Sequence, residues 1–337
     1  MQTFVASVFV FGLLIFAHEL GHFLAARLSG IRVLELAIGF GPKLISRRKN
    51  ETDYSLRLFP LGGFCRMLGE NPADADETGN FNKKPLHLRA AVLAAGSFMN
   101  LLLSVTVFFI IFFFLIGIPA LDTARLGKVF QNSPADQAGL QAGDEIISID
   151  GEQIRQWTEV VEAVNRKPGK TIDLVVQRNG QIIEFSPVVE LVPETERGMI
   201  GIAPVVERYQ FVSSWRASFD RFSQVAYSMY QVISGQAPLD VTGPVGIIIV
   251  VGEAAQTGII NLLWLTGLIS ISLGLINLLP LPSLDGGRLL FLLIEAVRGK
   301  PLDPEKEGFV HFVGFALLIL LILLVTYRDL IRWDIIP

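Results

Sequence analysis

The chain has 337 residues, of which 51% are hydrophobic and only 18% are charged, and its formal net charge is −4. Soluble domains carry about 25% charged residues, so this composition excludes a disordered protein and an ordinary water-soluble enzyme. The negative net charge excludes a nucleic-acid-binding protein that relies on a basic surface. The single cysteine, Cys65, excludes an intrachain disulfide and a zinc site of clustered thiolates.

Four apolar stretches are long enough to cross a bilayer, which takes about 20 helical residues. They cover residues 4–28, 90–118, 259–284 and 309–326. The first lacks the basic start and the small-residue cleavage site of a signal peptide, and it contains two histidines and a glutamate. We therefore predict a multi-pass α-helical membrane protein with four transmembrane helices and a retained first span.

Two of the loops between spans, at residues 29–89 and 298–308, are rich in Lys and Arg. Short positive loops stay on the cytoplasmic side of the membrane. We therefore expect both termini and the long segment at 119–258 on the outer side. Within the first loop, residues 56–69 are apolar but interrupted by Pro60 and two glycines. Because this stretch is too short and broken to span, it predicts either a membrane-associated hairpin, here called the β-loop, or a re-entrant loop at the inner face.

Residues 122–193 have the pattern of a small β-rich domain, with short apolar runs between turn signals. Asn179-Gly180 predicts a tight hairpin between two of these runs. The segments that resemble a bacterial protease-type PDZ domain are Ser133-Pro134-Ala135, Ala138-Gly139-Leu140, Gly143-Asp144 and Ile149-Asp150-Gly151. A generic β-rich domain is the alternative. PDZ domains bind peptides by β-augmentation, so we expect a peptide ligand, with residues 121–127 as the candidate carboxylate loop.

Downstream of this domain, residues 213–234 place apolar side chains three and four positions apart. This spacing predicts an amphipathic helix. Two placements fit the pattern equally well: a helix that lies in the outer membrane interface, and a helix packed on the soluble domain. The predicted organisation is thus 1–118 for the first two spans with the β-loop, 119–195 for the PDZ domain, 196–258 for the amphipathic helix and connecting segment, and 259–337 for the last two spans.

The first span contains His18-Glu19-Leu20-Gly21-His22. Histidines at i and i+4 project from one helix face, so both imidazoles can reach one Zn²⁺, and Glu19 beside them can act as a general base. The alternative is a set of polar residues that pack helices together. This alternative is disfavoured because a glutamate in a span costs about 2.5 kcal/mol or more unless it faces the protein interior or water.

A catalytic zinc site needs a third protein ligand and an open position. Asp285 is the candidate, because the first and third spans run in the same direction and both His18 and Asp285 fall near their inner ends. Pro280 and Pro282 interrupt the third helix and let the carboxylate turn inward. The alternative role for Asp285 is an N-cap of a helix at 286–297, and the two roles could coincide.

The two remaining histidines lie in different surroundings. His311 falls within the fourth span and is expected to be a packing or interfacial histidine rather than a ligand. His87 stands among Lys83, Lys84 and Arg89, which predicts an exposed, solvated side chain.

Taken together, these motifs resemble the site-2 protease family of intramembrane zinc metalloproteases, in its bacterial PDZ-containing branch of the regulator-of-sigma-E protease type. The resemblance covers nearly the whole chain. The motifs that carry it are HELGH at 18–22, GFGP at 39–42, PLGGFCRM at 60–67, AAGSFMN at 94–100, GPVGI at 243–247 and NLLPLPSLDGGR at 277–288. The chain departs from the family at Ser97, where a proline is usual, and in having one PDZ domain where many relatives have two.

The resemblance implies that His18, His22 and Asp285 ligate Zn²⁺ and that Glu19 is the catalytic base. It also implies that Asn277 holds the substrate backbone near the metal, and that the β-loop pairs with an unwound substrate strand. The β-loop residues proposed to contact substrate are Leu61, Gly62, Gly63 and Phe64. Asn100, at the end of the second-span motif, is a further candidate site residue.

The implied substrates are single-span membrane proteins, for example an anti-sigma factor or remnant signal peptides, first trimmed by an upstream site-1 protease. The implied location is the bacterial inner membrane, with the PDZ domain outside as a substrate filter and the active site near the cytoplasmic side. Other functions are open at this point. One is a zinc protease with a soluble active site, and another is a non-proteolytic PDZ membrane scaffold or a metal carrier, although a scaffold does not need Glu19 between two histidines in lipid.

Overall fold

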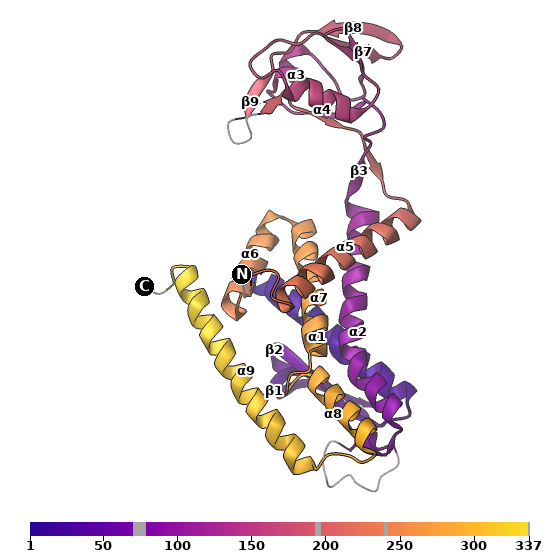
Figure 1. Ribbon diagram of the computed structural model, residues 1–337, viewed down its shortest axis with the longest axis vertical. Coiled ribbons are helices and arrows are strands. Elements are labelled where there is room, and N and C mark those ends of the chain that lie inside the picture. Colours follow the sequence, from indigo (N-terminus) through magenta and orange to yellow (C-terminus); the bar gives the residue numbers. More distant parts are fainter. Residues whose placement is uncertain (70–78, 193–196, 239–241, 336–337) are drawn as a thin grey trace. The chain divides into compact units, whose positions relative to one another are not determined.

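The structure is a computed structural model that describes residues 1–69, 79–192, 197–238 and 242–335 (Figure 1). It divides into two compact units, Met1–Ile111 with Ser214–Pro337 and Phe112–Ser213. We call the first the membrane unit and the second the β-rich unit. The described residues include four helices that are long and apolar enough to cross a membrane, at Gln2–Leu28, Leu86–Leu115, Ile259–Leu278 and Glu305–Arg332. The predicted four membrane helices are therefore confirmed.

The first two helices of the membrane unit cross at very short range. α1 (Gln2–Leu28) buries residues at spacings of three and four, and several of them are small. α2 (Leu86–Ile110) runs unbroken through Ser97 and continues into a π-helical turn at Ile111–Leu115. At the crossing, a Cβ on Gly21 of α1 would lie 2.3 Å from the carbonyl oxygen of Ala95 in α2. Glycine at this position therefore lets the two backbones touch.

Two long strands, β1 (Val33–Lys49) and β2 (Thr52–Met67), form the predicted β-loop. Residues 35–38 have Cα partners both in 63–66 and in 53–56, and residues 53–56 also pair with 45–48. The hairpin thus folds back on itself, and 63–67 becomes an edge with strand partners on one side only in the described sheet. The sheet end nearest α1 packs into a core with α1 and α2 that contains Ala26, Ile31, Val33, Leu36, Cys65, Met67 and Val92.

The C-terminal half of the membrane unit contains α6 (Pro244–Thr257), α7 (Ile259–Leu278), α8 (Asp285–Arg298) and α9 (Pro304–Arg332). α7 ends at Leu278, ahead of the two prolines that cannot continue a helix. Arg89 of α2 forms a two-pronged salt bridge with Glu295 of α8, with Nη1 at 3.1 Å from Oε2. This buried ion pair fixes α8 against α2.

The amphipathic helix predicted at 213–234 is α5 (Phe211–Ile233). Its Trp215 ring stacks on Phe109 of α2 at 4.7 Å, and Arg221 lies 5.1 Å from the centre of the Trp264 ring of α7. Phe219 and Tyr227, by contrast, are more than half exposed. One face of α5 therefore packs on membrane helices, while other aromatic side chains of the same helix stay uncovered.

The β-rich unit contains a four-stranded sheet in the order β6-β5-β7-β8 and three strand pairs, β4–β11, β9–β10 and β3–β12. The strands are β3 (Gly117–Pro119), β4 (Leu126–Val129), β5 (Glu145–Ile149), β6 (Glu152–Gln153), β7 (Leu174–Arg178), β8 (Gln181–Phe185), β9 (Glu190–Val192), β10 (Arg197–Met199), β11 (Ile202–Pro204) and β12 (Val206–Arg208). The helices are α3 (Pro134–Ala138) and α4 (Trp157–Asn165). They enclose a single apolar core with the sheet.

The turn between β7 and β8 is the hairpin that the sequence predicted. Arg178 pairs with Gln181, and the intervening Asn179 and Gly180 both have positive φ, as a tight two-residue turn requires. Strands β10 and β11 lie beyond residue 195, where we expected the domain to end. Because they pair with β9 and β4, the compact unit continues to Ser213.

Candidate active site

Three side chains from two helices meet in the membrane unit. His18 and His22, on one face of α1, have their Nε2 atoms 3.1 Å apart. Oδ2 of Asp285 lies 3.2 Å from the first of these atoms and 3.3 Å from the second. The three donor atoms therefore form a nearly equilateral triangle. The structure thus brings together the three residues that the sequence selected as zinc ligands.

The dimensions of this triangle can be compared with those of a zinc site. Tetrahedral zinc with bonds of about 2.0–2.1 Å holds its ligand atoms about 3.3 Å from one another. Oδ2 of Asp285 is buried and accepts no well-formed hydrogen bond from the described residues. A buried carboxylate oxygen flanked by two imidazole nitrogens is the donor set that zinc prefers, so the residues fit the metal.

Both imidazoles have a polar neighbour at their second ring nitrogen. Nδ1 of His22 lies 2.8 Å from the carbonyl oxygen of Val92, which fixes Nδ1 as the protonated nitrogen and leaves Nε2 with a free lone pair. Nδ1 of His18 lies 3.4 Å from Nδ2 of Asn100, a fully buried residue of α2. The amide oxygen of Asn100 has no hydrogen-bond partner among the described residues.

Gly96 of α2 packs directly against the imidazole rings of His18 and His22. A Cβ at this position would lie 2.3 Å from Nε2 of His22 and 2.8 Å from Cε1 of His18. Any side chain here would displace the imidazoles, because contacts below 3 Å are not tolerated. Gly96 is thus required for the triangle, a role that sequence reasoning missed.

Asp285 is the first residue of α8, and the N-cap is Leu284, which makes no side-chain capping bond. The carboxylate is therefore turned to the histidines and does not cap the helix. A Cβ on Gly286 would lie 2.1 Å from the carbonyl oxygen of Leu279, and one on Gly287 would lie 2.3 Å from that of Leu281. The two glycines after Asp285 let the preceding turn fold over the start of the helix.

Glu19 lies between the histidine pair and the edge strand of the β-loop. The backbone N–H of Cys65 donates a hydrogen bond to its carboxylate. A Cβ on Gly63 would lie 3.3 Å from Cγ of Glu19 and 2.9 Å from a methyl group of Ile15, so this stretch of β2 is in direct contact with α1. The contact places the edge of the β-loop beside the candidate general base.

The other predicted substrate-binding residues occupy different places. Gly62 has φ +111°, and a Cβ there would overlap the ring of Phe40, which stacks with Phe64 at 6.5 Å. The side chain of Leu61 lies outside the described residues. Asn277 is half-buried near the end of α7, and in the part of the chain that the structure describes its side chain makes no hydrogen bond.

A charge cluster stiffens the β-loop at some distance from the triangle. Oε1 of the buried Glu35 lies 2.7 Å from Ser55 Oγ, 2.8 Å from Arg57 Nη2 and 3.1 Å from Lys43 Nζ. Burial alone would raise the pKa of Glu35, but the hydrogen bonds from Ser55, Arg57 and Lys43 outweigh it and lower the pKa to about 2. Arg57 also covers the face of the Phe64 ring at 4.9 Å.

The β-rich unit has a groove of its own, with a volume of 160 Å³, between α4 and residues 198–202. Trp157, Val160 and Val164 line it from the helix side. Residues 121–127, the predicted carboxylate loop, are not among the lining residues.

The two remaining histidines lie away from the triangle. His87 is exposed, as the sequence predicted. His311 of α9 contacts the turn that precedes Asp285.

Comparison with known proteins gives consistent matches. The family model of Peptidase family M50 matches residues 6–321. Zinc metalloprotease RasP of Geobacillus kaustophilus is 36% identical over 98% of this chain and 98% of its own length. The regulator of sigma-W protease RasP of Bacillus subtilis is 35% identical over 98% of this chain and 99% of its own length. Among solved structures, the PDZ domain of the SdrC-like protein of Listeria monocytogenes is 24% identical, over 25% of this chain and 88% of that chain, with a TM-score of 0.23.

The family match starts in α1 and ends within α9, so it includes both segments that build the triangle. The two relatives, both at least 35% identical, are proteases, and one of them is named as a zinc enzyme. This chain is therefore a multi-pass membrane metalloprotease that belongs to peptidase family M50, as its motifs predicted.

Proposed function

We propose that this protein is an intramembrane zinc endopeptidase whose active site consists of His18, His22, Asp285 and Glu19. The observation that carries the proposal is the triangle of Nε2, Nε2 and Oδ2 atoms, 3.1–3.3 Å on each side. Both histidines lie on α1, a helix apolar enough to cross a membrane, and Asp285 begins α8, shortly after the membrane helix α7 ends. Ionisable groups in a membrane are costly and mark functional sites by default.

Zinc held by these three residues supplies a Lewis acid that polarises a carbonyl group and makes water more acidic. Glu19 accepts a proton from the attacking water and delivers it to the leaving amine, and the N–H of Cys65 orients its carboxylate. The carbonyl of Val92 orients His22. Asn100 orients His18, because rotation of its amide brings the unpartnered Oδ1 to the N–H of Nδ1.

The β-loop holds the substrate in this proposal. A transmembrane helix hides its amides, so a substrate must unwind before cleavage, and its freed backbone groups need partners. The β-loop edge at Gly63, Phe64 and Arg66 can supply them by β-augmentation, directly beside Glu19. Gly62 and Gly63 let the strand pack closely on Phe40 and on α1, and Asn277 adds an amide with no partner in the described structure.

The β-rich unit is proposed to be the PDZ domain that the sequence predicts, with its peptide-binding groove between α4 and residues 198–202. The positive loops favour a position of this domain outside the bacterial inner membrane, with the active site near the cytoplasmic face. The proposed substrates are single-span membrane proteins that an upstream site-1 protease has shortened enough for the PDZ domain to admit them.

The test is cleavage of a panel of single-span substrates by the purified protein in liposomes, with Glu19→Gln as the matched variant. We expect Glu19→Gln to keep its zinc and its fold and to lose activity by a factor of about 10²–10⁴, the range for removal of a general base. A variant that cuts at the wild-type rate would remove Glu19 from the mechanism. Zinc flux into the liposomes that persists in Glu19→Gln, without cleavage by the wild type, would favour a metal carrier.

A further inference from the structure

The chain makes a tight turn between α7 and Asp285. The N–H of Leu284 donates to the carbonyl of Leu281 at 3.2 Å, Pro282 occupies the second position, and Ser283 has φ +77° at the third. These are the features of a type II turn, whose third position strongly favours glycine because other residues crowd their own backbone there. This chain keeps a serine at the position.

The reason for the serine lies in α9. The backbone N–H of Ser283 donates to Nδ1 of His311 at 3.0 Å, and the hydroxyl of Ser283 donates to the backbone carbonyl of His311, also at 3.0 Å. Because Nδ1 accepts, the ring proton of neutral His311 is on Nε2, which faces Glu307 at 3.8 Å. A glycine would fit the turn with less strain but would lose the second hydrogen bond.

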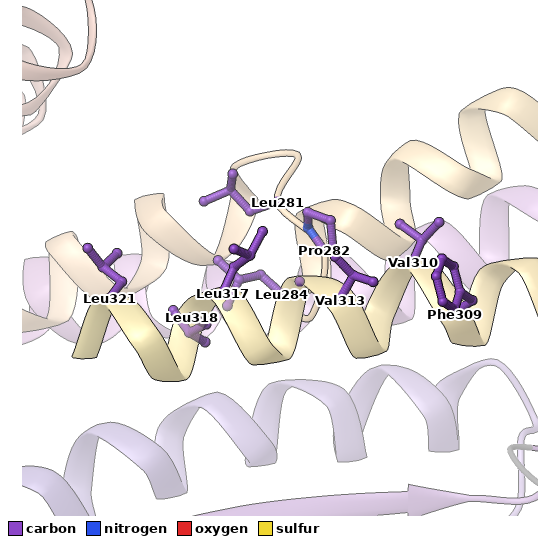
Figure 2. Close-up of a pocket in the computed structure, with 10 residues that line it drawn as sticks. Leu281, Pro282, Leu284, Phe309, Val310, Val313, Leu317, Leu318 and Leu321 are labelled. Carbon is purple, nitrogen blue, oxygen red and sulfur yellow. The ribbon is translucent and has the colours of Figure 1, made fainter. Parts of the chain in front are cut away.

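Two cavities adjoin this contact between α9 and the turn. One is an apolar pocket of 340 Å³, in which Leu281, Pro282 and Leu284 of the turn segment face the α9 residues labelled in Figure 2. Another is a cavity of mixed polarity, 520 Å³ in volume, whose lining includes Arg288, Glu307 and His311. Beside these open volumes, the two hydrogen bonds and the close approach of Gly314 to Pro282 hold the turn to α9.

The same turn determines where the Asp285 carboxylate lies. One residue separates Ser283 from Asp285, and the carbonyls of Leu279 and Leu281 pack on Gly286 and Gly287 at the start of α8. A shift of the turn therefore shifts the first residue of the helix. Metal sites tolerate little displacement of their ligands, and the outer groups that hold a ligand typically contribute a factor of 10–100 in affinity.

We propose that His311 is a positioning residue for the metal site. It accepts the N–H of Ser283, keeps the turn in its left-handed form and thereby holds the Asp285 carboxylate against His18 and His22. The inference rests on the proposed function, because it takes Asp285 as a zinc ligand. It gives α9 a role in the metal site although α9 supplies none of the three proposed ligands.

The test measures zinc affinity of the full chain in detergent by competition with a chelator, together with the visible spectrum of the cobalt-substituted protein. His311→Leu removes the acceptor and keeps the bulk, and we expect it to weaken zinc binding by about 10–100-fold and to change the cobalt spectrum. His311→Asn places an amide oxygen near the position of Nδ1 and should recover most of the affinity. His87→Leu, at an exposed histidine, is the matched control and should leave both readouts unchanged.

Ser283→Gly provides a second variant that suits the backbone of the turn, so it remains informative if His311→Leu does not fold. It removes one of the two hydrogen bonds, and we expect zinc affinity to fall by about 2- to 10-fold. Wild-type affinity in both His311→Leu and Ser283→Gly, or a His311→Asn variant as weak as His311→Leu, would overturn the inference alone. A wild-type chain that binds no zinc would overturn the proposed function and the inference together.

Discussion

Two aspartates, one in each unit, have opposite surroundings. Asp144 of the β-rich unit is 1% exposed, and Arg178 donates to both of its oxygens at 2.6 and 2.7 Å while the N–H of Gln141 adds a bond of 2.8 Å. Asp285 of the membrane unit has two imidazoles at its inner oxygen and no well-formed donor bond there from the described residues. The Asp144 carboxylate is saturated with donors, whereas the inner oxygen of Asp285 has no such bond among the described residues, as the proposed zinc site requires.

The comparison separates stability from function, because the same isosteric change should act differently at the two sites. Removing a partner from a buried ion pair leaves an uncompensated charge and is strongly destabilising. Removing a carboxylate that lacks donors costs the metal-free fold little. The predictions below test this separation, from the largest expected effect to the smallest.

The largest effect is expected from Asp285→Asn compared with Asp144→Asn. Asp285→Asn should weaken zinc binding by more than about 100-fold, beyond the range of outer positioning groups, because a charged ligand is lost. Asp144→Asn should destabilise the β-rich unit by about 3 kcal/mol and leave zinc affinity unchanged. The measurements are zinc affinity by chelator competition and thermal unfolding of the metal-free chain. A large loss of metal-free stability in Asp285→Asn would break the comparison.

The next effect is expected from Gly96→Ala in α2. The new methyl group would lie 2.3 Å from Nε2 of His22, so an imidazole must move and zinc affinity should fall by at least about 10-fold. Gly12→Ala in α1 is the control, because a Cβ there meets no atom within 4 Å. Equal zinc affinities for the two variants would show that Gly96 does not support the site.

A smaller effect is expected at Asn100. Asn100→Leu removes the amide that faces Nδ1 of His18, and zinc affinity should fall by about 10-fold, at the low end for such groups. Asn100→Asp keeps an acceptor and should retain more of the affinity. Ser104→Ala, a buried polar change on the same helix, should leave it unchanged, and a loss there as large as in Asn100→Leu would point to general disruption of α2.

The smallest effect is a pH dependence confined to the β-rich unit. Burial alone would raise the pKa of Asp144, but the hydrogen bonds from Arg178 and from Gln141 outweigh it and lower the pKa. The pair therefore stabilises the unit fully above the unfolded pKa of about 3.9 and loses this contribution as the pH falls below that value. Hydrogen exchange of β5 and β7, corrected for the intrinsic rate, should lose protection below pH ~4 in wild type. Asp144→Asn should lack this step.

Sequence patterns predicted those parts of the molecule that depend on local spacing. The separation of four residues placed His18 and His22 on one helix face, and four apolar runs of sufficient length predicted four membrane helices. Asp285 was selected because two parallel spans bring their inner ends to one depth. The structure brings these three side chains together, and their role as zinc ligands stays a prediction that the Asp285→Asn experiment tests.

Features that depend on tertiary contact had no signal in the sequence. The closeness of Gly96 to the histidines requires the crossing of α1 and α2, and the bond from Cys65 to Glu19 requires the β-loop to pack on α1. Strands β10 and β11 are too short for periodicity to reveal, so the sequence gives no signal that the compact unit extends to Ser213. A serine at position 283 of the turn before Asp285 is explained only by its two hydrogen bonds to His311, which lies 28 residues further along the chain.

The contact between Gly21 and Ala95 has a consequence for inhibitor design. Gly21 lies between the two histidines in the sequence and is set directly against the backbone of α2, so the two helices are in contact beside the histidine pair. A metal-chelating drug therefore cannot approach the histidines at this contact between α1 and α2. Short extended peptides with a zinc-binding head group and a backbone that pairs with the β-loop edge beside Glu19 suit the proposed site better.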